Sequence, residues 1–105
     1  MTTRKGQRDT RERLKTLLKL MPIAHPIRLI FCGLTEDTYA ETYVLDEGKP
    51  TARFIIRFAK DTDDELLDGT LIHEYAHAVS WYWEEADHGP SFGIAQARMW
   101  ALLYD

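Results

Sequence analysis

The stretch TLIHEYAHAVSW (residues 70–81) places His73, Glu74 and His77 inside an apolar segment with helical periodicity. The helical pattern begins near Thr62, which forms a capping box with Glu65, and continues to about Trp83. Apolar residues cover so much of its circumference that we expect a central helix, packed between a sheet and another helix. Burying titratable groups is costly unless they are paired or bind a metal. The stretch therefore predicts both the centre of the fold and a site on it.

Two further helices are expected, one toward each end of the chain. Asp9 is a suitable N-cap for a helix that runs to about Met21, where Pro22 ends it, and residues 1–8 are expected to form a flexible basic tail. Pro90 suits the first position of the last helix. The buried stripe of that last helix is predicted to contain Phe92, Ala95, Met99 and Leu103.

Three segments between the first and second helices have the composition of strands: residues 26–34, 39–45 and 52–59. Turn residues separate them, and the two connections are short. Short connections favour antiparallel neighbours, because a parallel crossover needs a dozen or more residues. We therefore predict an α+β fold with a small, mainly antiparallel sheet of about three strands packed against the three helices.

The composition predicts one globular domain over residues 1–105, with 45% hydrophobic and 29% charged residues. The net charge of −4 provides no global attraction for nucleic acid. A single cysteine excludes an internal disulfide and a cysteine-rich zinc site. Basic residues cluster near the N-terminus, either as a solvated helix face or as a local contact for nucleic acid or an acidic partner. They are Arg4, Lys5, Arg8, Arg11, Arg13, Lys15 and Lys19.

The chain carries no pattern that directs it to a membrane. Its N-terminal segment lacks the uninterrupted apolar region of a secretory signal. No segment approaches the roughly 20 apolar residues that a transmembrane helix requires. We therefore expect a cytoplasmic protein without a membrane partner; the sequence does not predict its oligomeric state.

The residues HEYAH match the pattern H-E-x-x-H. Helical positions four apart differ by about 40° of rotation, so His73 and His77 can present imidazole nitrogens to one metal ion. Glu74 lies about 100° round the helix from His73, where it can reach a water on that metal. This placement makes Glu74 a candidate general base, and the pair of histidines a candidate zinc site.

A hydrolytic zinc site needs a third protein ligand and an open position. Trp83 stands where the longer H-E-x-x-H-x-x-G-x-x-H pattern would need its third histidine, so that pattern is excluded. His88 is the preferred ligand, because Gly89 permits a sharp reversal and Pro90 begins the next helix. Glu84 shares a helical side with the two histidines. It is an alternative to His88 as the third ligand, or a group that orients one of the ligands. The other candidates are His25, Glu85 and Asp87.

TLIHEYAHAVSW, followed eleven residues after His77 by HGPSF, resembles the core of the SprT-like zinc metallopeptidases, the family of Spartan-type proteases. The resemblance covers about residues 50–104 and does not extend to the C-terminal zinc ribbon of many members, since the chain has one cysteine. It implies a zincin-like domain with one Zn²⁺ bound by His73, His77 and His88, and Glu74 as the catalytic acid/base. The residues that fill the motif are His73, Glu74, His77, His88, Gly89 and Phe92.

The expected function is a zinc metalloendopeptidase that hydrolyses peptide bonds of a protein or peptide substrate. In this hypothesis Glu74 is the general base toward a metal-activated water. Residues 52–59 are expected to form a sheet edge that pairs with the substrate backbone. Two alternatives remain: a zinc-stabilised binding module without catalysis, and a nucleic-acid-associated protein that uses the basic N-terminal segment. The sequence does not rank the tyrosines that are candidates for stabilising an oxyanion: Tyr39, Tyr43, Tyr75 and Tyr82.

Overall fold

The computed structural model describes residues 1–35, 37–83 and 89–104. It confirms the α+β class with three strands and three α-helices. A short 3₁₀ turn, η1, precedes the second helix. The elements in chain order are α1 (Arg4–Leu20), β1 (Ile27–Cys32), β2 (Ala40–Leu45), β3 (Arg53–Ala59), η1 (Asp64–Leu66), α2 (Leu67–Ser80) and α3 (Pro90–Tyr104).

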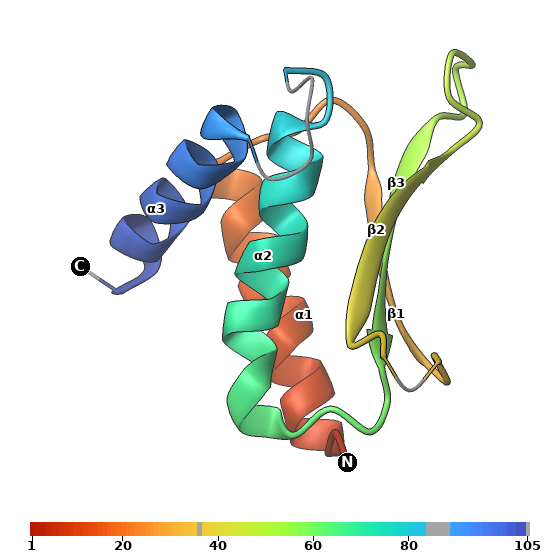
Figure 1. The fold of residues 1–105 in the computed structure, drawn as a ribbon, viewed down its shortest axis with the longest axis vertical. Coiled ribbons are helices and arrows are strands. Elements are labelled where there is room, and N and C mark those ends of the chain that lie inside the picture. Colours follow the sequence, from red (N-terminus) through yellow and green to blue (C-terminus); the bar gives the residue numbers. More distant parts are fainter. Residues whose placement is uncertain (36, 84–88, 105) are drawn as a thin grey trace.

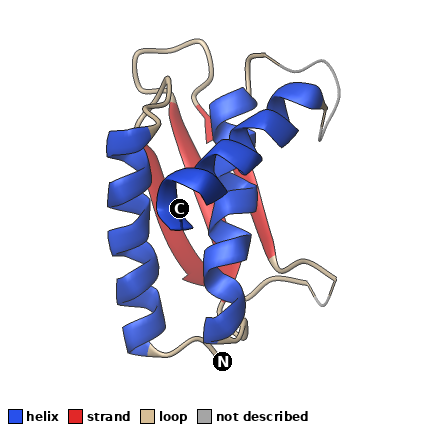
Figure 2. Ribbon diagram, turned by 90° about the vertical axis from the view of Figure 1, so that its left-hand side faces the viewer, coloured by secondary structure: helices blue, strands red, loops and turns tan. Residues whose placement is uncertain are grey.

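The three helices all lie on one face of the sheet (Figure 1). Two helices run side by side across the sheet, and a third crosses over them on the side away from the strands (Figure 2). That outer helix, α3, packs mainly on α2. The central position expected for the helix that carries HEYAH is therefore observed, with the sheet on one side of α2 and α3 on the other.

The sheet is mixed, with strand order β1-β3-β2. The expected antiparallel pairing holds for β2 and β3, but β1 runs parallel to β3 and does not pair with β2. The physical reason lies in β3, where Phe54, Ile55 and Ile56 are all at most 4% exposed. A strand that is apolar on both faces is most stable in the middle of a sheet, and residues 33–39 are long enough to carry the chain past that position.

This strand order corrects the sheet edge expected from the sequence. Residues 52–59 contain β3, which is hydrogen-bonded on both sides and cannot accept another strand. The edge strand beside α2 is instead β2. Any peptide that extends the sheet next to the HEYAH helix would therefore pair with β2.

The main core lies between the inner face of the sheet and the helices. Leu29 of β1 and Ile56 and Phe58 of β3 meet Leu17 of α1 and Leu71 of α2, all at most 3% exposed. The stripe predicted for α3 is confirmed, since its members belong to this core or pack against it. These members are Phe92, Ala95, Met99 and Leu103.

The N-terminal segment is not a flexible tail, because α1 begins at Arg4 instead of near Asp9. The N-cap is Thr3, whose hydroxyl accepts a hydrogen bond from the Gly6 amide at 2.9 Å. The Asp64 carboxyl accepts from the Thr3 hydroxyl and, at 2.9 Å, from the Thr3 amide, and these two bonds to Asp64 hold the pKa of its carboxyl below the usual range. A partner 61 residues away thus fixes the start of the helix, which local sequence does not reveal.

The second helix begins later and ends earlier than the sequence predicted. The capping box at Thr62 does not form: the Thr62 hydroxyl is buried and has no hydrogen-bond partner among the described residues. Instead η1 intervenes, and α2 runs from Leu67 to Ser80. Trp81 to Trp83 form a turn beyond the helix. The site residues nevertheless fall well inside α2, where the helix geometry is regular.

Candidate metal centre

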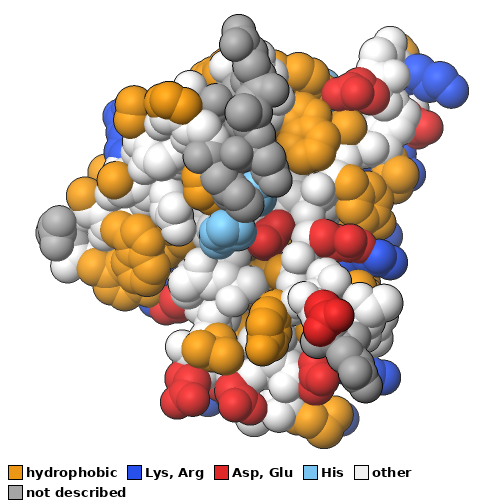
Figure 3. Space-filling view, viewed as in Figure 1, with side chains coloured by type: hydrophobic (Ala, Val, Ile, Leu, Met, Phe, Trp, Pro, Cys, Tyr) orange, Lys and Arg blue, Asp and Glu red, His pale blue; other side chains and the backbone are white. Residues whose placement is uncertain are grey.

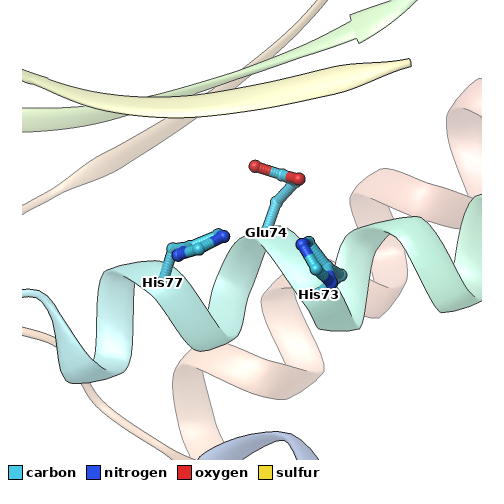
Figure 4. A group of neighbouring side chains, drawn as sticks. All are labelled: His73, Glu74 and His77. Atoms are coloured by element: carbon cyan, nitrogen blue, oxygen red, sulfur yellow. The ribbon is translucent and has the colours of Figure 1, made fainter. Parts of the chain in front are cut away.

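His73, Glu74 and His77 form a cluster that could hold a metal ion. One ligand atom from each residue lies within 4.8 Å of those of the other two. Figure 4 shows both imidazole rings projecting from neighbouring turns of α2, with Glu74 between them and directed toward the strands. The sequence predicted the histidine pair on one helical face, and the structure confirms it. Neutral imidazole and carboxylate are both ligands for divalent zinc.

Phe92 of α3 supports both histidines. Its ring centroid lies 5.1 Å from that of His73 and 4.6 Å from that of His77, and its side chain is only 5% exposed. The two imidazoles themselves are 5.1 Å apart between centroids. A buried aromatic ring against both histidines restricts their rotamers, which preorganises them as a pair. The aromatic residue of the HGPSF stretch therefore reaches the site from a different helix.

Glu74 is a buried carboxyl group with a partner on the sheet. It is 6% exposed, which is unusual for a glutamate unless it is hydrogen-bonded. The hydroxyl of Thr42 on β2 donates to its Oε1 at 2.8 Å and lies 3.1 Å from its backbone oxygen. The catalytic candidate is therefore fixed from the edge strand as well as by its own helix.

The cluster opens onto two adjoining hollows between α2 and β2. One, of about 570 Å³, is lined by His73 and Glu74 together with residues 37–40, Gly69 and Thr70. The other, of about 450 Å³, extends along residues 40–42 past His77 to Trp81. In the space-filling view, histidine and acidic side chains meet at the surface in the middle of this face (Figure 3). The site is thus accessible from solvent along the edge strand.

Two of the candidates for the third ligand, His88 and Glu84, lie outside the described residues, as do Glu85 and Asp87. Gly89 and Pro90 are described, and α3 does begin at Pro90 as predicted. His25 is not part of the cluster: its Nε2 lies 2.8 Å from the hydroxyl of Tyr82. This contact ties the segment before β1 to the turn that follows α2.

The structure separates the four tyrosines that the sequence left equivalent. Tyr75 is buried and donates to the Met21 carbonyl at 2.6 Å, and its burial raises the pKa of its hydroxyl. Tyr43 lies on the opposite face of the sheet under Arg57. Tyr82 bonds to His25. Tyr39 is the one that lines the hollow beside His73 and Glu74, within the described residues.

Several of the basic residues near the N-terminus already have partners within the domain. Arg11 donates to the Leu29 carbonyl at 2.7 Å, and Arg13 lies 3.4 Å from Asp68. Lys15 pairs with Glu12 at 3.1 Å. These internal contacts fit the interpretation of a helix face that packs against its own domain at one side and faces solvent at the other.

Sequence reasoning missed Thr42. A threonine in a strand is ordinary, because its branched side chain suits the pleated backbone. Nothing in the local pattern distinguishes it from Thr38 or Thr51. Its role emerges only from the packing of β2 against α2, which brings together residues 32 positions apart.

Comparison with protein-family models, with curated proteins and with solved structures finds no match for this chain. None of the helices in the described part of the chain has the length and apolar character needed to span a membrane.

Proposed function

We propose that this protein is a zinc-dependent metallopeptidase of the SprT-like kind that cleaves peptide bonds in a protein or peptide substrate. The observation that carries the proposal is the trio of His73, Glu74 and His77, clustered within 4.8 Å at the wall of an open hollow. A purely structural zinc site would be closed by protein ligands and would not need an adjacent buried carboxylate.

In this proposal His73 and His77 bind the zinc ion, and His88 supplies the third imidazole. A zinc ion bound there supplies Lewis acidity, which activates water and polarises a carbonyl group. Glu74 accepts a proton as the nucleophile attacks and later donates it to the leaving amine. Burial of Glu74 beside Thr42 suits this role, because a fixed carboxylate needs little reorganisation during the reaction.

The substrate is proposed to bind in an extended conformation along β2. Ala59 donates its amide to the Tyr39 carbonyl at 2.7 Å, which identifies residues 39 and 59 as a hydrogen-bonded pair. Hydrogen-bonded and free positions alternate in antiparallel strands, so the backbones of Ala40, Thr42 and Val44 face the open edge. A peptide paired there would lie beside the hollow that contains Glu74.

The test combines metal analysis with a cleavage assay on wild type and the Glu74→Gln variant. We expect about one zinc per chain in both proteins, with casein or self-cleavage by wild type only. The glutamine is close in shape to glutamate but cannot accept the proton, so hydrolysis should fall by roughly a thousandfold or more.

Each other outcome has a distinct meaning. A Glu74→Gln variant as active as wild type would remove Glu74 from the reaction. Zinc that binds and stabilises the fold, without cleavage of any unfolded substrate, would indicate the non-catalytic binding module instead. Failure of wild type to bind zinc at all would contradict both the metallopeptidase and the non-catalytic zinc module.

A further inference from the structure

We propose that Thr42 is a positioning residue, whose hydroxyl holds the Glu74 carboxylate in its reactive orientation and links it to the strand that receives the substrate. This inference rests on the proposed function. It assigns a role to a residue that no motif in the sequence includes.

The contact itself is short and specific. Thr42 Oγ1 lies 2.8 Å from Glu74 Oε1, within the range of a good O–H···O hydrogen bond. Thr42 carries one hydroxyl proton, and the carboxylate oxygen is a stronger acceptor than the backbone oxygen 3.1 Å away. The bond therefore restrains the outer end of the Glu74 side chain.

The position of Thr42 on β2 gives the bond its second function. Its side chain faces α2, while the alternation of the strand directs its backbone N–H and C=O to the open edge. The side chain and backbone of one residue thus connect the two halves of the proposed site. A peptide that pairs with β2 would fix the backbone of the residue that holds the general base.

The residues around Thr42 indicate that packing alone does not require a threonine at this position. Its neighbours on the same face of β2 are Ala40 and Val44, both apolar, and opposite it in β3 lies fully buried Ile56. Valine would fill the same space and suits a strand at least as well. At this position threonine differs from valine mainly by the hydroxyl that donates to Glu74.

The experiment compares Thr42→Val with Thr42→Ser in the zinc-loaded full chain, with peptide hydrolysis and zinc affinity as readouts. Loss of a group that orients a site residue typically costs 10- to 100-fold, so we expect Thr42→Val to lower kcat by about that factor. KM and zinc affinity should stay within about threefold, because neither the edge backbone nor the histidines change. Thr42→Ser, which keeps the hydroxyl, should recover most of kcat.

The control is Thr10→Val, which removes a buried hydroxyl donated to the Gly6 carbonyl of α1, away from the site. It should leave kcat unchanged even if it lowers stability. If Thr42→Val does not fold, the pair Thr42→Ser and Thr42→Ala differs by one oxygen and gives the same comparison. Hydrolysis by wild type with equal kcat in the valine or alanine variant would overturn the role of Thr42 alone. Absence of hydrolysis in wild type would instead overturn the proposed function and this inference with it.

Discussion

The inner and outer faces of the sheet differ in what surrounds their side chains. On the inner face, under the helices, Phe54, Ile56 and Phe58 are fully buried. On the outer face, which no described helix covers, Arg57 forms an ion pair with Glu41 and stacks over Tyr43. These outer-face residues therefore interact with each other while they remain partly in contact with water.

A polar side chain has a different energetic cost on the outer face than in the layer between sheet and helices. A charged group on the outer face keeps part of its hydration and costs little, whether or not it is paired. A polar group in the layer between sheet and helices must have a partner, because an unsatisfied donor or acceptor there loses its water. Thr42 and Glu74 lie in that layer, and the Thr42 hydroxyl donates to the Glu74 carboxylate.

The largest effect on the free energy of unfolding is expected at two adjacent isoleucines of β3, Ile55 and Ile56, whose side chains lie on opposite faces of the sheet. Ile56→Ala should lower the free energy of unfolding by about 2–5 kcal/mol, because it leaves a cavity beneath α2. Ile55 is equally apolar and 4% exposed, but solvent and flexible side chains can fill its place. Ile55→Ala should therefore cost only the transfer term, roughly 2 kcal/mol. Urea unfolding of both variants measures the difference; equal losses would mean that the outer face is as enclosed as the inner one.

A smaller difference in the free energy of unfolding is expected between variants that lack one of two tyrosine hydroxyls. Tyr75→Phe removes the hydrogen bond to the Met21 carbonyl and should cost about 0.5–1.5 kcal/mol. Tyr43→Phe on the outer face should change the free energy of unfolding by less, since the stacking of Arg57 on its ring remains. Thermal unfolding at one pH is sufficient to rank the two. A larger loss for Tyr43→Phe would mean that a hydroxyl on the outer face contributes more to stability than a buried one.

The smallest effect concerns the turn between β2 and β3. Hydrogen bonds from Arg53 and Thr51 hold the pKa of the Asp46 carboxyl below its usual 3.8. Because the folded protein binds this proton less readily than the unfolded chain, Asp46 stabilises the fold above the unfolded pKa. That contribution is lost as the pH falls through the folded pKa.

The matched variant is Asp46→Asn, since asparagine tolerates the positive φ of 54° found at this position. Wild type should be slightly more stable than the variant at pH 7, and the difference should disappear as the pH falls through the folded pKa, which lies below 3.8. Salt should reduce it as well. A difference that is constant from pH 7 to pH 2 would show that the charge of Asp46 contributes nothing.

The sequence by itself determined the features that depend on short-range periodicity. The spacing of HEYAH fixes both histidines on one face of a helix, and Pro90 fixes the start of α3. The α+β class follows from the same periodicities of apolar residues, which differ between helix and strand. These features need no knowledge of what the segments contact.

Tertiary structure decided the features that depend on partners far apart in the chain. Four features belong to this class: the central place of β3, the early start of α1 that Asp64 stabilises, the support of both imidazoles by Phe92, and the pairing of Thr42 with Glu74. Each is a choice among local structures of similar free energy. Long-range burial and hydrogen bonding make that choice, and no pattern within a single segment records it.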